Sequence, residues 1–129
     1  MGPMGELQRV FMVDDEADIR TVVELSLSMV GRFTVEVCAS GPEALETAPV
    51  FGPDLILLDV MMPGMDGPTT LKRLREIPAL ARTPVVFMTA KVQPLEVAQL
   101  RALGALDVLA KPFDPMALAD SLQRIWDSR

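Results

Sequence analysis

Five short apolar runs along the chain have the length and composition of β-strands. They cover residues 9–13, 34–38, 54–58, 85–88 and 107–110. Most of these runs are almost continuously apolar, which is typical of strands buried on both faces of a parallel sheet. The second run, Thr34-Val35-Glu36-Val37-Cys38, instead alternates apolar and polar positions. This alternation predicts a strand that lies nearer an edge of the sheet.

Longer segments, in which apolar residues recur every three or four positions, separate the strands and predict helices. They cover residues 16–30, a segment from 40 onward, 68–76, 94–103 and a segment from 114 onward. Ser40 can cap the second helix, and Glu43 completes a capping box with it. The first helix is expected to end near Gly31. Gly104 marks the end of the fourth helix, at the position after a helix where a left-handed residue is favoured.

Strands and helices therefore alternate along the whole chain. This alternation predicts an α/β fold, in which a five-stranded parallel sheet carries helices on both faces. A length of 129 residues is enough for one domain, which we place at residues 6–129. Residues 1–5 read Met-Gly-Pro-Met-Gly, and we interpret them as a remnant of an expression tag outside the domain.

The composition limits where the protein can be located and which classes of partner it can bind. The formal net charge of −6 predicts an acidic surface, which would repel nucleic acids and anionic membranes. No apolar run approaches the roughly 18 residues of a membrane-spanning helix, and the N-terminus does not resemble a signal peptide. Cys38 is the only cysteine and there is no histidine, so an internal disulfide and a histidine base are excluded. These features favour a cytoplasmic location.

Polar residues collect where the predicted strands end. Asp14 and Asp15 follow the first strand, Asp59 the third, Thr89 the fourth and Lys111 the fifth. Each alone has a structural interpretation, since acids cap helices and begin turns. However, the carboxyl ends of parallel strands share one edge of a sheet, where ligands bind at the switch point of strand order. Their joint placement therefore predicts a functional site.

The residue types at these strand ends suit phosphoryl chemistry. Three clustered aspartates repel one another unless a cation joins them. Hard oxygen ligands in small number are typical of Mg²⁺, which usually takes one or two carboxylates together with phosphate oxygens. A carboxylate beside a metal ion, an ammonium group and a hydroxyl can accept a phosphoryl group as an acyl phosphate.

Four segments resemble the signature segments of response-regulator receiver domains, which belong to two-component signalling. The segments are residues 11–16 (Phe-Met-Val-Asp-Asp-Glu), 57–67, 88–90 (Met-Thr-Ala) and 110–113 (Ala-Lys-Pro-Phe). The resemblance extends over about residues 7–126 and is to receivers of the single-domain chemotaxis-regulator type. It implies a flavodoxin-like, doubly wound sheet with strand order 2-1-3-4-5.

The resemblance also implies a metal site. Asp15, Asp59 and the backbone carbonyl of Met61 would bind Mg²⁺ directly. Asp14 would act mainly through a metal-bound water.

The same resemblance implies a role for each remaining site residue. Asp59 would accept the phosphoryl group, Thr89 would bond to it, and Lys111 would pair with its oxygens or, before phosphorylation, with the carboxylates. The Lys111–Pro112 peptide bond is expected to be cis. The chain would catalyse only its own phosphorylation and dephosphorylation, so we do not expect a turnover enzyme.

The partners implied by the resemblance are proteins. A histidine kinase or a histidine phosphotransfer protein would donate the phosphoryl group. A downstream protein would bind the face formed by the fourth helix, fifth strand and fifth helix, which corresponds to residues 93–101, 108–110 and 116–124.

One position departs from the family pattern. Many receiver domains carry an aromatic residue three positions before the lysine, whereas this chain has Val108, and it contains no tyrosine. Switching by an aromatic side chain is therefore not expected here. Met61 and Lys91 follow Asp59 and Thr89 by two residues, and we hypothesise that they tune the attack of water on the acyl phosphate.

Three other functions fit parts of the pattern. A flavin-binding module would need a phosphate-binding loop where this chain has Asp14-Asp15-Glu16. A phosphatase of the haloacid-dehalogenase type would need an acid where Met61 stands. A degenerate receiver, which binds partners without being phosphorylated, remains the main alternative, because Val108 replaces the aromatic residue.

Overall fold

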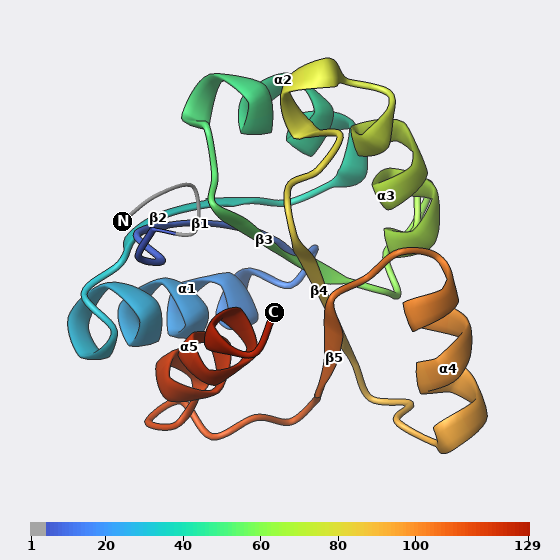
Figure 1. Cartoon of the computed structure of the whole chain (residues 1–129). Coiled ribbons are helices and arrows are strands. Elements are labelled where there is room, and N and C mark those ends of the chain that lie inside the picture. The colour runs from blue at the N-terminus through green and yellow to red at the C-terminus, as the bar shows by residue number, and fades with distance from the viewer. Residues whose placement is uncertain (1–4) are drawn as a thin grey trace.

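The computed structural model describes residues 5–129 as an α/β sandwich with helices on both faces of a central sheet (Figure 1). Its strands are β1 (Arg9–Val13), β2 (Thr34–Cys38), β3 (Leu55–Asp59), β4 (Val85–Thr89) and β5 (Asp107–Ala110). Its α-helices are α1 (Ala17–Leu25), α2 (Gly41–Phe51), α3 (Gly67–Arg75), α4 (Pro94–Ala102) and α5 (Leu118–Asp127). A π-helical turn, η1 (Ser26–Val30), extends α1, and a 3₁₀ turn, η2 (Pro78–Leu80), follows α3.

The sheet has the strand order and direction implied by the family resemblance. All neighbouring strands pair in parallel, in the order β2-β1-β3-β4-β5. The flavodoxin-like fold is thereby confirmed. The order reverses direction at β1 and β3, so the crevice between their carboxyl ends is the switch point, where such sheets bind ligands.

Two hydrophobic cores hold the helices on the sheet. One core joins α1 and α5 to one face, through residues such as Val23, Leu27 and Leu122. The other joins α2, α3 and α4 to the opposite face, through residues such as Leu74 and Leu100. All five residues of β3 and of β4 are buried, as expected for the central strands of a parallel sheet covered on both faces.

Several predicted helix boundaries are confirmed in atomic detail. The Ser40 hydroxyl accepts a hydrogen bond from the Glu43 amide, and the Glu43 carboxylate accepts one from the Ala39 amide, which forms the expected capping box. Gly104 follows α4 with φ of +105°, a conformation that other residues rarely adopt.

The start of the last helix was predicted too early. The Asp114 carboxylate accepts a hydrogen bond from the Met116 amide, and the Asp114 carbonyl accepts one from the Ala117 amide. These two bonds close a separate turn, so α5 begins only at Leu118. The Ser26 hydroxyl, which donates to the Pro115 carbonyl, ties this turn to the end of α1.

Gly67 brings the start of α3 against the end of β3. A Cβ atom at this position would collide with the Asp59 carbonyl oxygen and would lie 2.8 Å from the Val60 Cα. The Gly67 amide donates a hydrogen bond to the Val60 carbonyl. The loop that follows Asp59 is thus held tightly against its own strand, which fixes the backbone that carries the Asp59 carboxylate.

Gly5, the first described residue, contacts the last helix at the end of the sheet opposite the site. The Trp126 indole donates a hydrogen bond to the Gly5 carbonyl. Residues 1–4 lie outside the described part of the chain, so the proposed tag remnant remains a prediction. Among residues 5–129, no helix is long and apolar enough to cross a membrane.

Candidate phosphorylation and metal site

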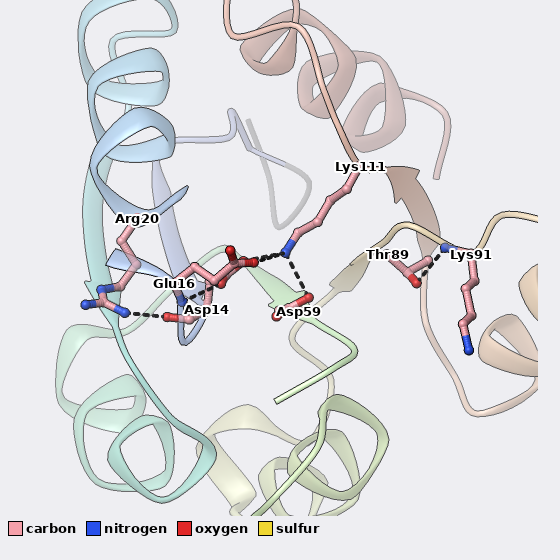
Figure 2. Close-up of polar contacts among 7 residues, drawn as sticks. All are labelled: Asp14, Glu16, Arg20, Asp59, Thr89, Lys91 and Lys111. Carbon is pink, nitrogen blue, oxygen red and sulfur yellow. Dashed lines mark hydrogen bonds and ion pairs between the residues drawn. The ribbon is translucent and has the colours of Figure 1, made fainter. Parts of the chain in front are cut away.

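A single lysine joins two aspartates from different strands. The Lys111 Nζ lies 2.7 Å from Asp14 Oδ2 and 3.0 Å from Asp59 Oδ1 (Figure 2). Both carboxylates are buried, with 0% of Asp14 and 3% of Asp59 exposed. A more distant contact of 4.0 Å joins the Lys111 Nζ to the exposed Glu16 carboxylate. The predicted convergence of Asp14, Asp59 and Lys111 is therefore observed in the structure.

Backbone contacts orient the Asp14 carboxylate. The Asp14 amide donates to the Cys38 carbonyl, and Asp14 Oδ1 accepts a hydrogen bond from the Glu16 amide at 2.8 Å. Arg20 Nη1 donates to the Asp14 carbonyl at 2.7 Å, so α1 is tied back to the end of β1. The contributions of Arg20 and Glu16 were not predicted. Their only sequence signal is proximity to the acidic pair.

The aspartates form a cluster suited to a divalent cation. Carboxylate oxygens of Asp14, Asp15 and Asp59 all lie within 4.8 Å of one another, and Asp15 is exposed to solvent. Carboxylate oxygens at this spacing fit Mg²⁺, which prefers hard oxygen ligands and keeps several of its waters. The exposed Asp15 leaves an open side from which a hydrated ion can enter. Met61 lies in the adjoining loop with 65% of its surface exposed.

Burial and neighbouring charges change the pKa values of Asp59 and Lys111. Burial raises the pKa of Asp59 from 3.8 to about 6; the negative charge of Asp14 adds to this rise, and the hydrogen bond from Lys111 opposes it. Burial also opposes the positive charge of Lys111, but its hydrogen bonds to Asp14 and Asp59 outweigh that effect and raise its pKa. At neutral pH, Asp59 is thus an ionised but destabilised carboxylate.

Thr89 lies at the end of β4 but is engaged elsewhere. It is 2% exposed, and its hydroxyl accepts a hydrogen bond from the Lys91 amide at 3.0 Å. Within the described residues, it forms no hydrogen bond with Asp59 or with the Lys111 ammonium. The Lys111 amide, however, donates to the Thr89 carbonyl at 2.9 Å, so β4 and β5 present the two side chains at the same edge.

Three further expectations concern residues around the site. The Lys111–Pro112 peptide bond is cis, as the resemblance implied. Val108 is half-buried beside Phe87, in register with it across β4 and β5. Cys38 is buried, and burial raises the pKa of its thiol to about 12, which agrees with a structural rather than a reactive role.

Fold and site together define a class of protein: a doubly wound α/β domain with a lysine and an acidic, metal-compatible cluster at its switch point. Comparison with known families agrees with this class. A family model described as the response regulator receiver domain matches residues 10–123. This chain therefore belongs to the response regulator receiver domains, which are phosphorylation-controlled signalling domains of two-component systems rather than classical enzymes. Such domains interact with histidine kinases or phosphotransfer proteins and with downstream targets.

Several known proteins are similar over most of the chain. The chemotaxis protein CheY4 of Vibrio cholerae superposes with a TM-score of 0.85 and 36% identity, covering 92% of this chain and 98% of that one. The receiver domain of the sensor histidine kinase PA1611 from Pseudomonas aeruginosa has a TM-score of 0.80 and 30% identity, covering 93% of this chain and 98% of that one. That domain was crystallised with a magnesium ion coordinated in its active site cleft.

Curated relatives are longer than this chain. The alkaline phosphatase synthesis transcriptional regulatory protein PhoP of Bacillus subtilis is 37% identical over 108 residues, which is 84% of this chain but 44% of that protein. The chain spans about half the length of the first curated relatives it matches, at 41% to 45% of each. The similarity therefore concerns the receiver domain and not the remainder of those proteins.

The raised pKa of Asp59 leads to a prediction about stability. Because its folded-state pKa of about 6 exceeds 3.8, stability is greatest when Asp59 is protonated and is lost as the pH rises through about 6. Asp59→Asn should remove this loss. We expect the variant to exceed the wild type in free energy of unfolding by about 1–3 kcal/mol near neutral pH, and the difference to shrink towards about pH 4.

Urea unfolding across this pH range, without divalent metal, measures the effect. Asp120→Asn serves as the control, because it removes an exposed carboxylate of α5 whose surface ion pair with Arg124 should contribute little to stability. A wild type that is more stable than Asp59→Asn near neutral pH would contradict the burial argument.

Proposed function

We propose that the chain is a signalling switch that accepts a phosphoryl group on Asp59 from a phosphohistidine donor, in a Mg²⁺-dependent reaction within a two-component phosphorelay. One observation carries the proposal: a buried, destabilised carboxylate at the end of β3 lies 3.0 Å from the Lys111 ammonium and beside two further aspartates. Such a carboxylate is stabilised by any change that spreads its negative charge towards neighbouring cations.

In the transfer step, an Asp59 carboxylate oxygen bonds to phosphorus while the bond between phosphorus and the donor imidazole nitrogen breaks. The Lys111 ammonium is near enough to contact the transferred phosphoryl oxygens. The Thr89 hydroxyl, at the neighbouring strand end, donates to them once it turns from the Lys91 amide. Asp15, Asp59 and the Met61 carbonyl would hold a metal ion, with Asp14 acting through water, and the ion would supply further positive charge at these oxygens.

The acyl phosphate is returned to the carboxylate by water. Attack at phosphorus releases inorganic phosphate and restores Asp59, so the domain catalyses its own reset and has no other substrate. We place the donor as a histidine kinase or a histidine phosphotransfer protein in the cytoplasm. Output is proposed at the face formed by α4, β5 and α5.

A degenerate receiver that acts as a phosphorylation-independent interaction module is the second candidate. Val108 favours it, because an aliphatic side chain of this size offers no large rotamer change through which phosphorylation could be signalled. The same fold would then display its α4, β5 and α5 surface constantly. This candidate retains the acidic cluster without using it.

Intact mass separates the two candidates. After incubation with acetyl phosphate and Mg²⁺, the wild type should gain one phosphoryl group and Asp59→Asn should gain none, because its amide is not a nucleophile. Asp54→Asn is the matched control, since Asp54 precedes the same strand at its opposite end and should leave phosphorylation intact. No gain in the wild type, with Mg²⁺ binding confirmed by calorimetry, would favour the degenerate receiver.

Met61 and Lys91 should control the lifetime of the acyl phosphate. Both line a hollow that reaches Thr89, and the exposed Met61 side chain lies two residues from Asp59. We expect Met61→Ala to admit water and to speed dephosphorylation by roughly two- to tenfold, and Lys91→Ala to change the rate by a similar factor. Phosphate release from the phosphorylated protein measures this rate. Unchanged rates in both variants would reject the hypothesis.

A further inference from the structure

A hollow of about 330 Å³ separates α4 from the phosphorylation site. Its inner wall includes Thr89, and its outer wall is the inward side of α4, with Glu96 and Leu100. Val60 and Met61, from the loop after β3, complete much of the apolar lining. The hollow thus connects a residue of the site directly to a helix of the proposed output face.

Glu96 points an unsatisfied carboxylate oxygen into this region. Its Oε2 is buried and has no hydrogen-bond partner among residues 5–129. An unpaired buried acceptor is costly, and the cost is larger for a charged group. A conformation that places a positively charged side chain beside the Glu96 carboxylate therefore removes this cost.

Lys91 is a cationic residue that lines the same hollow as Glu96. Lys91 and Glu96 together line both this hollow and a second one beside it, over the loop between β4 and α4. In the described structure, the Lys91 ammonium forms no salt bridge, and Figure 2 shows its side chain directed away from Asp59. A lysine stem can lie along apolar walls such as Leu100 while its ammonium reaches a carboxylate.

The Thr89 hydroxyl holds Lys91 in its present position. It accepts the hydrogen bond from the Lys91 amide at 3.0 Å, which fixes the first residues of the loop. A rotation of the Thr89 side chain that carries its hydroxyl to a phosphoryl oxygen breaks this bond. The Lys91 backbone is then free to move, while Thr89 remains anchored in β4.

The amino-terminal half of α4 is the part of the fold that can respond. Leu100 is the only buried residue of this helix, and Gln93 at its N-cap makes no side-chain hydrogen bond. The carboxyl-terminal end is held by the ion pair of Arg101 and Asp107 at 2.5 Å. The helix is therefore attached at one end and weakly packed at the other.

We propose that phosphorylation closes a latch in which Lys91 enters the hollow and pairs with Glu96, so that the amino-terminal half of α4 becomes fixed to the loop after β4. The latch rests on the proposed function, because the phosphoryl group is what draws the Thr89 hydroxyl away from the Lys91 amide. It transmits the signal without a large side-chain rotation at Val108. The output face is then altered by the position and rigidity of α4.

Amide hydrogen exchange of residues 94–99, measured by NMR, tests the latch. Beryllofluoride with Mg²⁺ serves as a stable mimic of the phosphoryl group, and its bound fluorine resonance reports occupancy independently. We expect beryllofluoride to slow exchange in the wild type by about five- to tenfold, the range of a partly buried ion pair. Glu96→Gln should bind beryllofluoride equally well but lose this protection. Glu46→Gln, an exposed glutamate of α2, should keep it.

An exchange of charges distinguishes the latch from a direct contact between Lys91 and the phosphoryl group. The double variant Lys91→Glu with Glu96→Lys should recover most of the protection that either single change removes. Bound beryllofluoride with unchanged protection in Glu96→Gln, or no recovery in the double variant, would overturn the latch. Absence of the bound fluorine resonance in the wild type would instead contradict the proposed function on which the latch rests.

Discussion

The site depends on one shared cation, the ammonium group of Lys111. Asp14 and Asp59 end neighbouring strands and are almost completely buried, so their charges repel each other where water cannot screen them. Lys111, which follows β5, lies within 3.0 Å of both and compensates much of this repulsion. The compensation is incomplete, because burial, to which the charge of Asp14 adds, still raises the pKa of Asp59 to about 6. Additional positive charge would therefore stabilise the cluster. Phosphorylation would also stabilise it, because the charge of the Asp59 carboxylate then moves onto the phosphoryl oxygens.

The fold supplies this arrangement through close contacts between strand ends and helix starts. A parallel sheet places every carboxyl end at one edge, and its reversal of order opens the crevice between β1 and β3. Gly67 lets α3 start against the Asp59 backbone, and Arg20 ties α1 to the Asp14 carbonyl. Asp14 and Asp59 are thus carried at strand ends, and a helix start contacts the backbone of each. Precision of this kind is what electrostatic stabilisation of a transferred group requires.

Much of the fold could be predicted from the sequence, because the strands are short apolar runs and the helix caps are standard. Strand order came from the family resemblance, since local pattern does not specify which strands pair. The late start of α5 was missed because Asp114 closes a separate turn. The pair Asp114-Pro115 is also typical of the first residues of a helix, so the sequence does not distinguish the two structures. The bonds from Arg20 and to Thr89 were missed for a related reason: they join side chains to backbone groups whose positions only the folded chain defines.

Chemical trapping tests the central claim, that Asp59 is the phosphoryl acceptor, most directly. Borohydride reduces an acyl phosphate but leaves free carboxylates intact, so it converts the phosphorylated aspartate into homoserine. Peptide mass spectrometry of protein treated with acetyl phosphate, Mg²⁺ and borohydride should find homoserine at position 59, and the product should disappear when Mg²⁺ is omitted. Homoserine at Asp14 or Asp15 in place of Asp59, or at none of the three, would contradict the account.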